Sequence, residues 1–523
     1  MVNQVKLAVA SPRVWLGDVR KNTEEILRLV REAASAGAGA IVFPRDAVTG
    51  ASCGSLAGHP LMQASAQAAR ARILQAGSDA GIEVILSSQR RGALVLLCEA
   101  EPERVAHWDR IRAALGAWCW QHACSLALAN AGYGESTTDC VYGGGSLVIG
   151  PDGVEIAQGA RFHRDSRLVY AEVPWSEAAP SPVAGLAELL PADAPKPPFP
   201  DRPNPFIPLD PDELARRCDE IFEIQTTGLA TRLEHIHARS AVIGVSGGLD
   251  STLALLVSVR AADALGWSRS QVIGVTMPGF GTTDHTHGNA SALMSTLGIT
   301  RRDISIVPSV TRHLQDIGHP LDRHDTTYEN AQARERTQIL MDIAGDEGGL
   351  VVGTGDLSEL ALGWCTFNGD HMAMYGVNAG LPKTLMREMV RHASERHFPG
   401  AAPILISVLE TPVSPELLPG VQPTEDIVGP YDLHDFFLYA LLRQEMSPRQ
   451  ILDAAAERLA PRYDRAAIEK WLPVFLRRFF AQQFKRNCGP DAPQIGSVCL
   501  SPRGSFRMPS DLSAAVWMDE LAG

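Results

Sequence analysis

A turn rich in glycine and hydroxyl side chains occupies residues 246–252, which read SGGLDST. It follows the apolar run 240–245, which is typical of a buried strand, and it opens a helical stretch that extends to about residue 265. Glycines let the backbone approach an anion closely, and free N–H groups at a helix start and nearby hydroxyls donate to phosphate oxygens. An acid in this turn, Asp250, would repel phosphate unless Mg²⁺ lay between them. The turn predicts phosphate contacts from Ser246, Gly247, Gly248, Asp250, Ser251 and Thr252.

Further motifs follow this turn along the chain. The turn lacks the GK[ST] ending of a Walker loop, and it resembles the loop of the ATP pyrophosphatase family, which splits ATP into AMP and pyrophosphate. The other segments around it are 277–280, 328–336, 353–364, 375–384, 484–486 and 501–511. Together they resemble the synthetase domain of the glutamine-dependent NAD synthetase family over residues 212–520.

The resemblance implies a two-step reaction with ATP as a substrate and Mg²⁺ as its metal. The nicotinate carboxylate of deamido-NAD attacks the α-phosphate of ATP, pyrophosphate leaves, and ammonia then displaces AMP to give NAD. Lys383 would offset charge on the leaving pyrophosphate, and Trp364 is suited to stack on the pyridine ring. The resemblance assigns catalysis to Asp250, Glu359 and Lys383, Mg²⁺ binding to Asp250 and Glu359, further phosphate contacts to Thr354, Lys383 and Ser414, and the dinucleotide to Asn330, Arg336, Trp364, Asp370 and Lys485.

The first part of the chain resembles the nitrilase-like domain that supplies ammonia from glutamine in that family. The resemblance lies in AIVFP (40–44) followed by VTG (48–50), and in GYGESTTD (132–139). The family's chemistry needs a Cys nucleophile, a Glu base and a Lys donor. Here Arg45 stands where the family has Glu, and no lysine lies between Lys21 and Lys196. Cys98, at a strand end, fits packing better than catalysis.

We therefore expect a shortened, degenerate nitrilase-like domain without glutaminase activity, fused to an NAD synthetase that uses free ammonia. Two alternatives stay open. The first is a related adenylating ligase with a different carboxylate, or with a different amine or thiol nucleophile, because 319–328 is short and Phe367-Asn368 departs from the usual residues before Gly369-Asp370. The second is a catalytically silent nucleotide-binding scaffold.

The predicted fold class is α/β. Residues 1–180 form the shortened nitrilase-like domain, and 212–523 form a doubly wound, parallel-sheet domain of the ATP pyrophosphatase type that becomes helical from about 430. Between them, 181–211 is a proline-rich linker, because ten prolines fall within residues 180–208 and proline fits neither a helix interior nor a central strand.

Composition limits the remaining function classes. The chain has 523 residues, 45% of them hydrophobic, and a net charge of −13, which argues against bulk binding to nucleic acid or anionic membranes. No apolar run approaches the ~18 residues of a membrane helix, and no signal peptide is recognisable. Nine cysteines without a CxxC pair indicate neither a disulfide framework nor a zinc site. We expect a cytoplasmic homodimer or higher homo-oligomer, and a separate ammonia-supplying protein is a further candidate partner.

Overall fold

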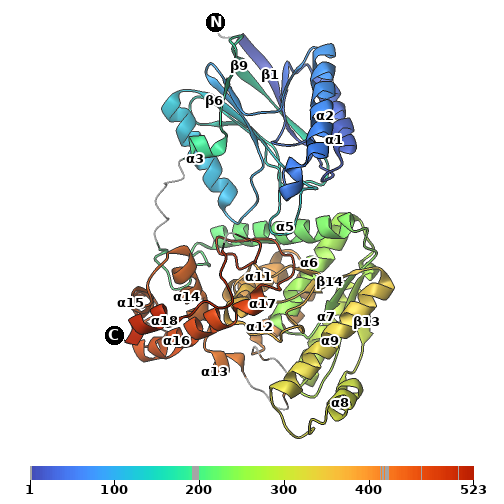
Figure 1. The fold of residues 1–523 in the computed structure, drawn as a ribbon, viewed down its shortest axis with the longest axis vertical. Coiled ribbons are helices and arrows are strands. Elements are labelled where there is room, and N and C mark those ends of the chain that lie inside the picture. The colour runs from blue at the N-terminus through green and yellow to red at the C-terminus, as the bar shows by residue number, and fades with distance from the viewer. Residues whose placement is uncertain are drawn as a thin grey trace. The chain divides into compact units, whose positions relative to one another are not determined.

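The computed structural model describes residues 3–190, 199–412, 414, 417–418, 423–460, 462–504 and 506–522. The chain divides into two compact units, Met1–Lys196 and Pro197–Gly523, each of which is described by itself (Figure 1). Residues 191–198, the middle of the predicted linker, lie outside the described residues, so the predicted boundaries at 180 and 212 stay predictions. Within the described part of the chain, no helix is long and apolar enough to cross a membrane.

The first unit contains two β-sheets. One has the order β3-β2-β1-β9 and the other the order β10-β4-β5-β6-β7-β8. The strands are β1 (Asn3–Ser11), β2 (Ala40–Val42), β3 (Glu83–Ile85), β4 (Gln89–Arg91), β5 (Leu94–Glu99), β6 (Ser125–Asn130), β7 (Leu147–Ile149), β8 (Glu155–Gln158), β9 (Arg167–Trp175) and β10 (Ser181–Pro182). The helices are α1 (Val19–Ser35), the 3₁₀ turn η1 (Gly54–Gly58), α2 (Pro60–Asp79), α3 (His107–His122) and α4 (Leu186–Leu189).

Alternation along β1 explains how these sheets stack. Leu7 and Val9 belong to the apolar core between the two sheets, whereas Ala8 and Ala10 belong to the core beneath α1 and α2. A third core joins β5 and β6 to α3, through residues such as Leu97. The unit is therefore a four-layer α/β/β/α sandwich.

The second unit is built on a parallel sheet of five strands in the order β13-β12-β11-β14-β15. The strands are β11 (Ala241–Gly244), β12 (Val272–Thr276), β13 (Thr300–Asp303), β14 (Leu350–Gly353) and β15 (Tyr375–Gly376). The connecting elements are α5 (Pro211–His235), α6 (Leu249–Leu265), η2 (Arg269–Gln271), α7 (Asp284–Leu297), α8 (Val307–Asp316), α9 (Thr326–Glu347), α10 (Leu357–Leu362), α11 (Lys383–Arg396), η3 (Pro399–Ala401) and α12 (Ala402–Glu410). The chain runs from β11 outward to β13 and then returns to the other side of β11, so the strand order reverses between β11 and β14.

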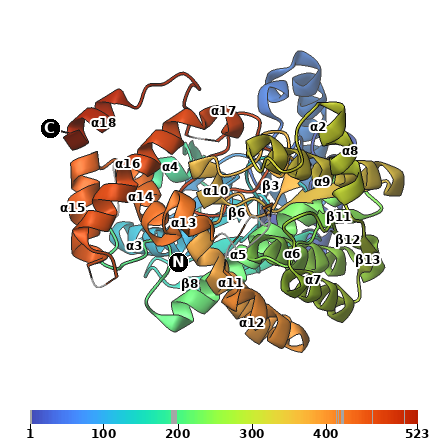
Figure 2. The ribbon, with the colours of Figure 1, turned by 90° about the horizontal axis from the view of Figure 1, so that it is seen from below.

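The last part of the second unit is helical, as predicted. Its helices are α13 (Thr424–Val428), α14 (Tyr431–Arg443), α15 (Pro448–Arg458), α16 (Arg465–Ala481), α17 (Gln483–Arg486) and α18 (Ala515–Ala522). Figure 2 shows α14, α15 and α16 grouped together, away from strands β11 to β13. They share an aromatic core that includes Phe436, Phe437 and Phe475, and Phe199 packs on Phe436 with ring centroids 5.0 Å apart. The two units confirm the predicted α/β class.

Candidate active site

The reversal of strand order between β11 and β14 fixes the place of the site. In open parallel sheets, ligands bind at such switch points, outside the carboxyl ends of the strands. The predicted phosphate loop follows β11 directly, and the segment Thr354–Asp356 follows β14. Two motifs that are about 100 residues apart in the sequence therefore lie at one edge of the sheet.

The loop after β11 has the backbone of an anion cradle. Gly247 has φ +85°, and a Cβ placed on it would lie 2.1 Å from the carbonyl oxygen of Thr286, so only glycine fits. Helix α6 begins after Gly248 without a side-chain cap, which leaves the N–H groups of its first turn available to a ligand. The Ser246 and Ser251 hydroxyl oxygens lie 3.1 Å apart. The structure thus brings these predicted phosphate contacts together.

Thr252 differs from the other predicted phosphate contacts. Its side chain is fully buried, and among the described residues its hydroxyl has no hydrogen-bond partner. Thr354 lies near the loop, because its carbonyl oxygen and that of Asp250 both accept hydrogen bonds from the Asn378 amide, at 3.1 and 3.0 Å. Ser414 is surrounded in the sequence by residues outside the described set, so its phosphate contact stays a prediction.

A cluster of charged side chains lies beside the loop. The Lys383 ammonium group, at the start of α11, is 2.7 Å from Asp250 Oδ1, 2.5 Å from Asp356 Oδ2 and 2.9 Å from Glu359 Oε1. Lys383 and Asp356 are buried, whereas Asp250 and Glu359 remain partly open to solvent. The three catalytic residues expected from the sequence are therefore in direct contact, together with a fourth, Asp356.

Charge does not balance in this cluster, since three carboxylates share one ammonium group. Burial raises the pKa of Asp356 to about 6, against the opposing charge of Lys383. Burial and the neighbouring Asp356 raise the pKa of Glu359 well above its usual value. Burial alone would lower the pKa of Lys383, but the charges of Asp250, Asp356 and Glu359 outweigh it and raise that pKa well above normal. Clusters of titratable groups with perturbed pKa values are typical of reaction sites.

The same carboxylates suit a divalent cation. Asp250, Asp356 and Glu359 can each offer one oxygen, and these atoms lie within 4.8 Å of one another. Mg²⁺ prefers carboxylate oxygens and usually keeps several waters. The predicted Mg²⁺ ligands, Asp250 and Glu359, are the two cluster acids that solvent reaches, so the donor set fits that ion.

Asp356 was not predicted as a site residue, although it lies in the recognised segment 353–364. It accepts a hydrogen bond from the Glu359 backbone N–H at 2.9 Å and so caps α10. The D-x-x-E spacing directly after a buried strand was the available signal.

Asp435 on α14 was also missed by the sequence analysis. Its carboxylate accepts hydrogen bonds from the Ser358 and Thr384 hydroxyls. Asp435 lies about 50 residues from the nearer of these two residues, so nothing in the sequence connects them.

Four of the five predicted dinucleotide residues gather around residues 363–366. The Thr366 hydroxyl donates to Asn330 at 2.8 Å, and the Thr366 backbone N–H donates to Asp370 at 2.6 Å. The Lys485 ammonium group donates to the carbonyl oxygens of Gly363 and Cys365, on either side of Trp364 in the chain. Together these contacts fix the chain around Trp364.

Trp364 and Arg336, two of the predicted dinucleotide residues, have different neighbours. One face of Trp364 is near the Arg478 guanidinium, whose centre is 5.3 Å from the ring. Arg336 has a different setting, because it donates to the carbonyl oxygen of Met277, at 3.1 Å, in the segment 277–280. The charge of Arg336 also acts on Asp370, where it opposes the rise in pKa that burial causes, and the substrate role of Arg336 stays a prediction.

In the first unit, Arg45 follows β2 and is exposed. Cys98 belongs to the core between the two sheets, and burial raises the pKa of its thiol to about 12, in keeping with packing. Glu135, in the predicted nitrilase-like segment, accepts hydrogen bonds from the backbone N–H groups of Ala51, at 2.8 Å, and Ser52, at 3.0 Å. Glu135 thereby joins two loops of this unit.

The fold and the site define the class as a parallel α/β protein with an anion-binding loop beside a carboxylate cluster, and comparison with known proteins agrees with that class. Residues 221–471 match the NAD synthase family model. A glutamine-dependent NAD(+) synthetase from Mycobacterium leprae is 39% identical over 453 residues, which are 75% of this chain and 65% of that protein. The one from Synechocystis is 31% identical over 324 residues, 61% of this chain and 51% of that protein. The chain thus spans less than two thirds of the length of these curated relatives.

Solved structures show the same fold. A glutamine-dependent NAD(+) synthetase from Cytophaga hutchinsonii superposes with a TM-score of 0.80 at 15% identity and covers 100% of both chains. The enzyme from Acinetobacter baumannii, solved with adenosine diphosphate, gives a TM-score of 0.63 at 19% identity, covering 96% of this chain and 98% of that one. The chain is thus similar to the NAD synthase family over residues 221–471, and the named relatives are AMP-forming carbon–nitrogen ligases.

These relatives overturn one prediction. The sequence predicted a chain without glutaminase activity, whereas the relatives are named glutamine-dependent, and their nitrilase-like domain is typically the glutaminase. That prediction is therefore wrong. It rested on Arg45 in place of the expected Glu, on the absence of a catalytic cysteine and of a lysine between Lys21 and Lys196, and on the short length of the domain, whereas the first unit keeps a two-sheet sandwich.

Proposed function

We propose that this chain is an NAD(+) synthetase that activates the nicotinate carboxylate of deamido-NAD with ATP and converts it to the amide, releasing AMP and pyrophosphate. The observation that carries the proposal is the contact of Lys383 with Asp250, Asp356 and Glu359 beside the loop 246–252. The similarity to the NAD synthase family and the fold support it, and the relatives' name supports NAD as the product.

Each group has a defined task in this proposal. The loop's N–H groups and the Ser246 and Ser251 hydroxyls bind ATP phosphates. Asp250 and Glu359 hold Mg²⁺, which neutralises phosphate charge. Lys383 stabilises the negative charge that develops on the leaving pyrophosphate. Asp356 positions Lys383, since it is fully buried and lies 2.5 Å from the ammonium nitrogen.

The dinucleotide is assigned to the region around Trp364. An indole ring offers a flat face to a pyridine ring, and Asn330, Asp370 and Lys485 surround it with polar groups. These groups have hydrogen bonds to the chain between Gly363 and Thr366, so their positions are set before substrate binds.

We further propose a homodimer or higher homo-oligomer located in the cytoplasm. Light scattering on the purified protein would test the oligomeric state, and fractionation of cells would test the location.

The test of the proposal is a reaction of the purified chain with ATP, Mg²⁺, deamido-NAD and ammonium. Ammonium makes the test independent of how nitrogen is delivered, and a parallel reaction with glutamine examines the donor that the relatives' name indicates. We expect AMP and NAD in equal amounts. AMP formation that does not depend on deamido-NAD, or no AMP at all, would refute the proposal.

A further inference from the structure

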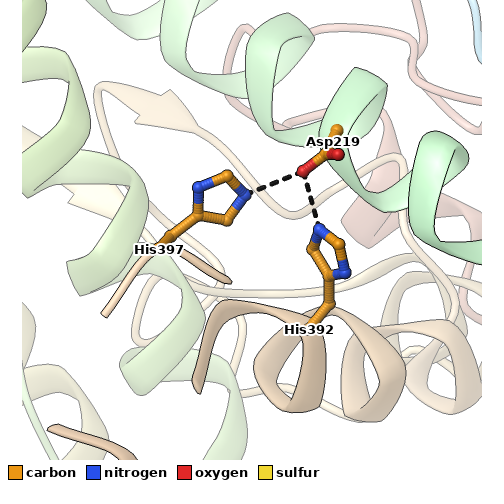
Figure 3. A group of neighbouring side chains, drawn as sticks. All are labelled: Asp219, His392 and His397. Atoms are coloured by element: carbon orange, nitrogen blue, oxygen red, sulfur yellow. Dashed lines mark hydrogen bonds and ion pairs between the residues drawn. The ribbon is translucent and has the colours of Figure 1, made fainter. Parts of the chain in front are cut away.

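A second group of metal-ligating side chains lies apart from the carboxylate cluster. It consists of Asp219 on α5, His392 on α11 and His397, the residue that ends α11. The Nε2 atoms of His392 and His397 lie 2.6 and 2.9 Å from the same oxygen, Asp219 Oδ1, as Figure 3 shows. Both rings thus point at one carboxylate from different positions on the chain.

We infer that Asp219, His392 and His397 form a binding site for a divalent transition-metal ion of the zinc class. Each residue can offer one ligand atom, and all three atoms lie within 4.8 Å of one another. Two imidazole nitrogens and one carboxylate oxygen are a common three-ligand set for such ions, with water in the fourth place. Ligands around a tetrahedral zinc ion lie about 3.4 Å apart, so each histidine nitrogen needs to move less than about 1 Å further from the Asp219 oxygen.

The solvent exposure of Asp219 and the nitrogen ligands of the two histidines both favour a zinc-class ion. Asp219 is 55% exposed, so an ion and its water can enter, while His392 at 8% and His397 at 18% are held in place by the protein. Nitrogen ligands distinguish the group from Asp250, Asp356 and Glu359, which offer only oxygen and suit Mg²⁺. Among the residues that the structure describes, these are the two groups with metal-ligand geometry.

Arg260 is the neighbour that opposes binding. Its guanidinium lies 2.9 Å from Nδ1 of His397, so this ring accepts there and donates from Nε2 to Asp219. A neutral imidazole that binds an ion through Nε2 carries its proton on Nδ1, so the proton must move there and Arg260 must turn away. Glu223 already binds the other amino group of Arg260 at 2.7 Å and can retain it.

The site would join two helices of the second unit. Asp219 lies in the first half of α5, and the two histidines lie at the end of α11. Lys383, the lysine of the carboxylate cluster, is the first residue of α11. A bound ion would therefore hold the far end of the helix that presents Lys383.

The test uses the full chain after treatment with a chelator, titrated with Co²⁺ in excess Mg²⁺ so that the carboxylate cluster is filled. Tetrahedral Co²⁺ with nitrogen ligands absorbs strongly in the visible range. We expect one such ion per chain, displaced by Zn²⁺, and binding at least about tenfold weaker in Asp219→Asn and His392→Gln.

The matched control is His287→Gln, because His287 forms a comparable pair with Asp303, at 2.7 Å, on other elements. That variant should bind Co²⁺ as the unaltered chain does. Absence of the visible absorption in the unaltered chain would overturn the inference, whatever the folding of the variants. Undiminished binding in both Asp219→Asn and His392→Gln would also overturn it.

Discussion

Glu135 and Glu99 in the first unit and the carboxylate cluster in the second unit are stabilised in different ways. In the first unit, Glu135 is met by the backbone N–H groups of Ala51 and Ser52, and Glu99 accepts from the Leu186 N–H at 2.6 Å. In the second unit, three carboxylates converge on the single ammonium group of Lys383. Fixed backbone donors stabilise a carboxylate without a ligand, whereas the second arrangement leaves negative charge that a cation can neutralise. Unbalanced charge distinguishes the proposed reaction site from the buried acids of the first unit.

The largest effect is expected from Lys383→Met. The substitution removes the only cation of the cluster and the proposed donor to the leaving pyrophosphate, so AMP formation should fall by about 10²–10³ or more. The measurement is the initial rate with saturating ATP, deamido-NAD and ammonium. Lys470→Met, at an exposed position on α16, is the control and should keep the full rate. Equal rates in both variants would contradict the role of Lys383.

Gly247→Ala should have the next largest effect. Its φ of +85° costs an alanine about 1–2 kcal/mol, and the added Cβ would also meet the Thr286 carbonyl oxygen. We expect AMP formation to fall steeply, because the loop must shift. Gly298→Ala is the matched control: its φ is +71° but nothing lies within 4 Å of the added Cβ, so it should lose some stability and keep its rate. Similar rates for the two variants would show that the close contact is unimportant.

Glu→Gln substitutions at Glu359 and at Glu135 compare an acid of the carboxylate cluster with a buried acid of the first unit. Glu359→Gln should raise the Mg²⁺ concentration needed for half-maximal rate about tenfold or more, since it removes a proposed ligand. Glu135→Gln should leave the rate with ammonium unchanged and lower stability by about 1–3 kcal/mol, since an amide N–H₂ group would face backbone donors. Steady-state kinetics at varied Mg²⁺ measures the first effect and thermal unfolding measures the second, each on both variants. The reverse pattern would contradict the distinction between the two kinds of acid.

The last effect concerns the pH dependence of stability, through Asp435, and needs no change in the reaction rate. Burial raises the pKa of this carboxyl from 3.8 to about 7 in the folded chain. The folded state then binds more protons than the unfolded state between about pH 4 and 7, so this group lowers stability as pH rises through that range, by at most about 1.4 kcal/mol per pH unit. Unfolding of the unaltered chain and of Asp435→Asn should show different slopes with pH. Parallel slopes would mean that Asp435 is ionised in both states.

The sequence was sufficient for the fold class and for the loop 246–252, because both depend on local patterns: an apolar strand, glycines and a helix start. It also named Asp250, Glu359 and Lys383, which the structure places in contact. Asp356 was missed although it lies inside a recognised motif. Asp435 and the group of Asp219, His392 and His397 were missed because helices far apart in the chain bring them together. The error about glutaminase activity came from giving Arg45, the missing lysine and the short length of the domain more weight than the resemblance of the domain as a whole.

The most direct test of the central claim follows one oxygen atom. If the carboxylate of deamido-NAD attacks the α-phosphate of ATP and ammonia then displaces AMP, one carboxylate oxygen remains on AMP. Deamido-NAD labelled with ¹⁸O in the nicotinate carboxylate, incubated with the chain, ATP, Mg²⁺ and ammonium, should give AMP that carries one ¹⁸O and pyrophosphate that carries none. Label in pyrophosphate or inorganic phosphate, or NAD formed together with unlabelled AMP, would contradict the account.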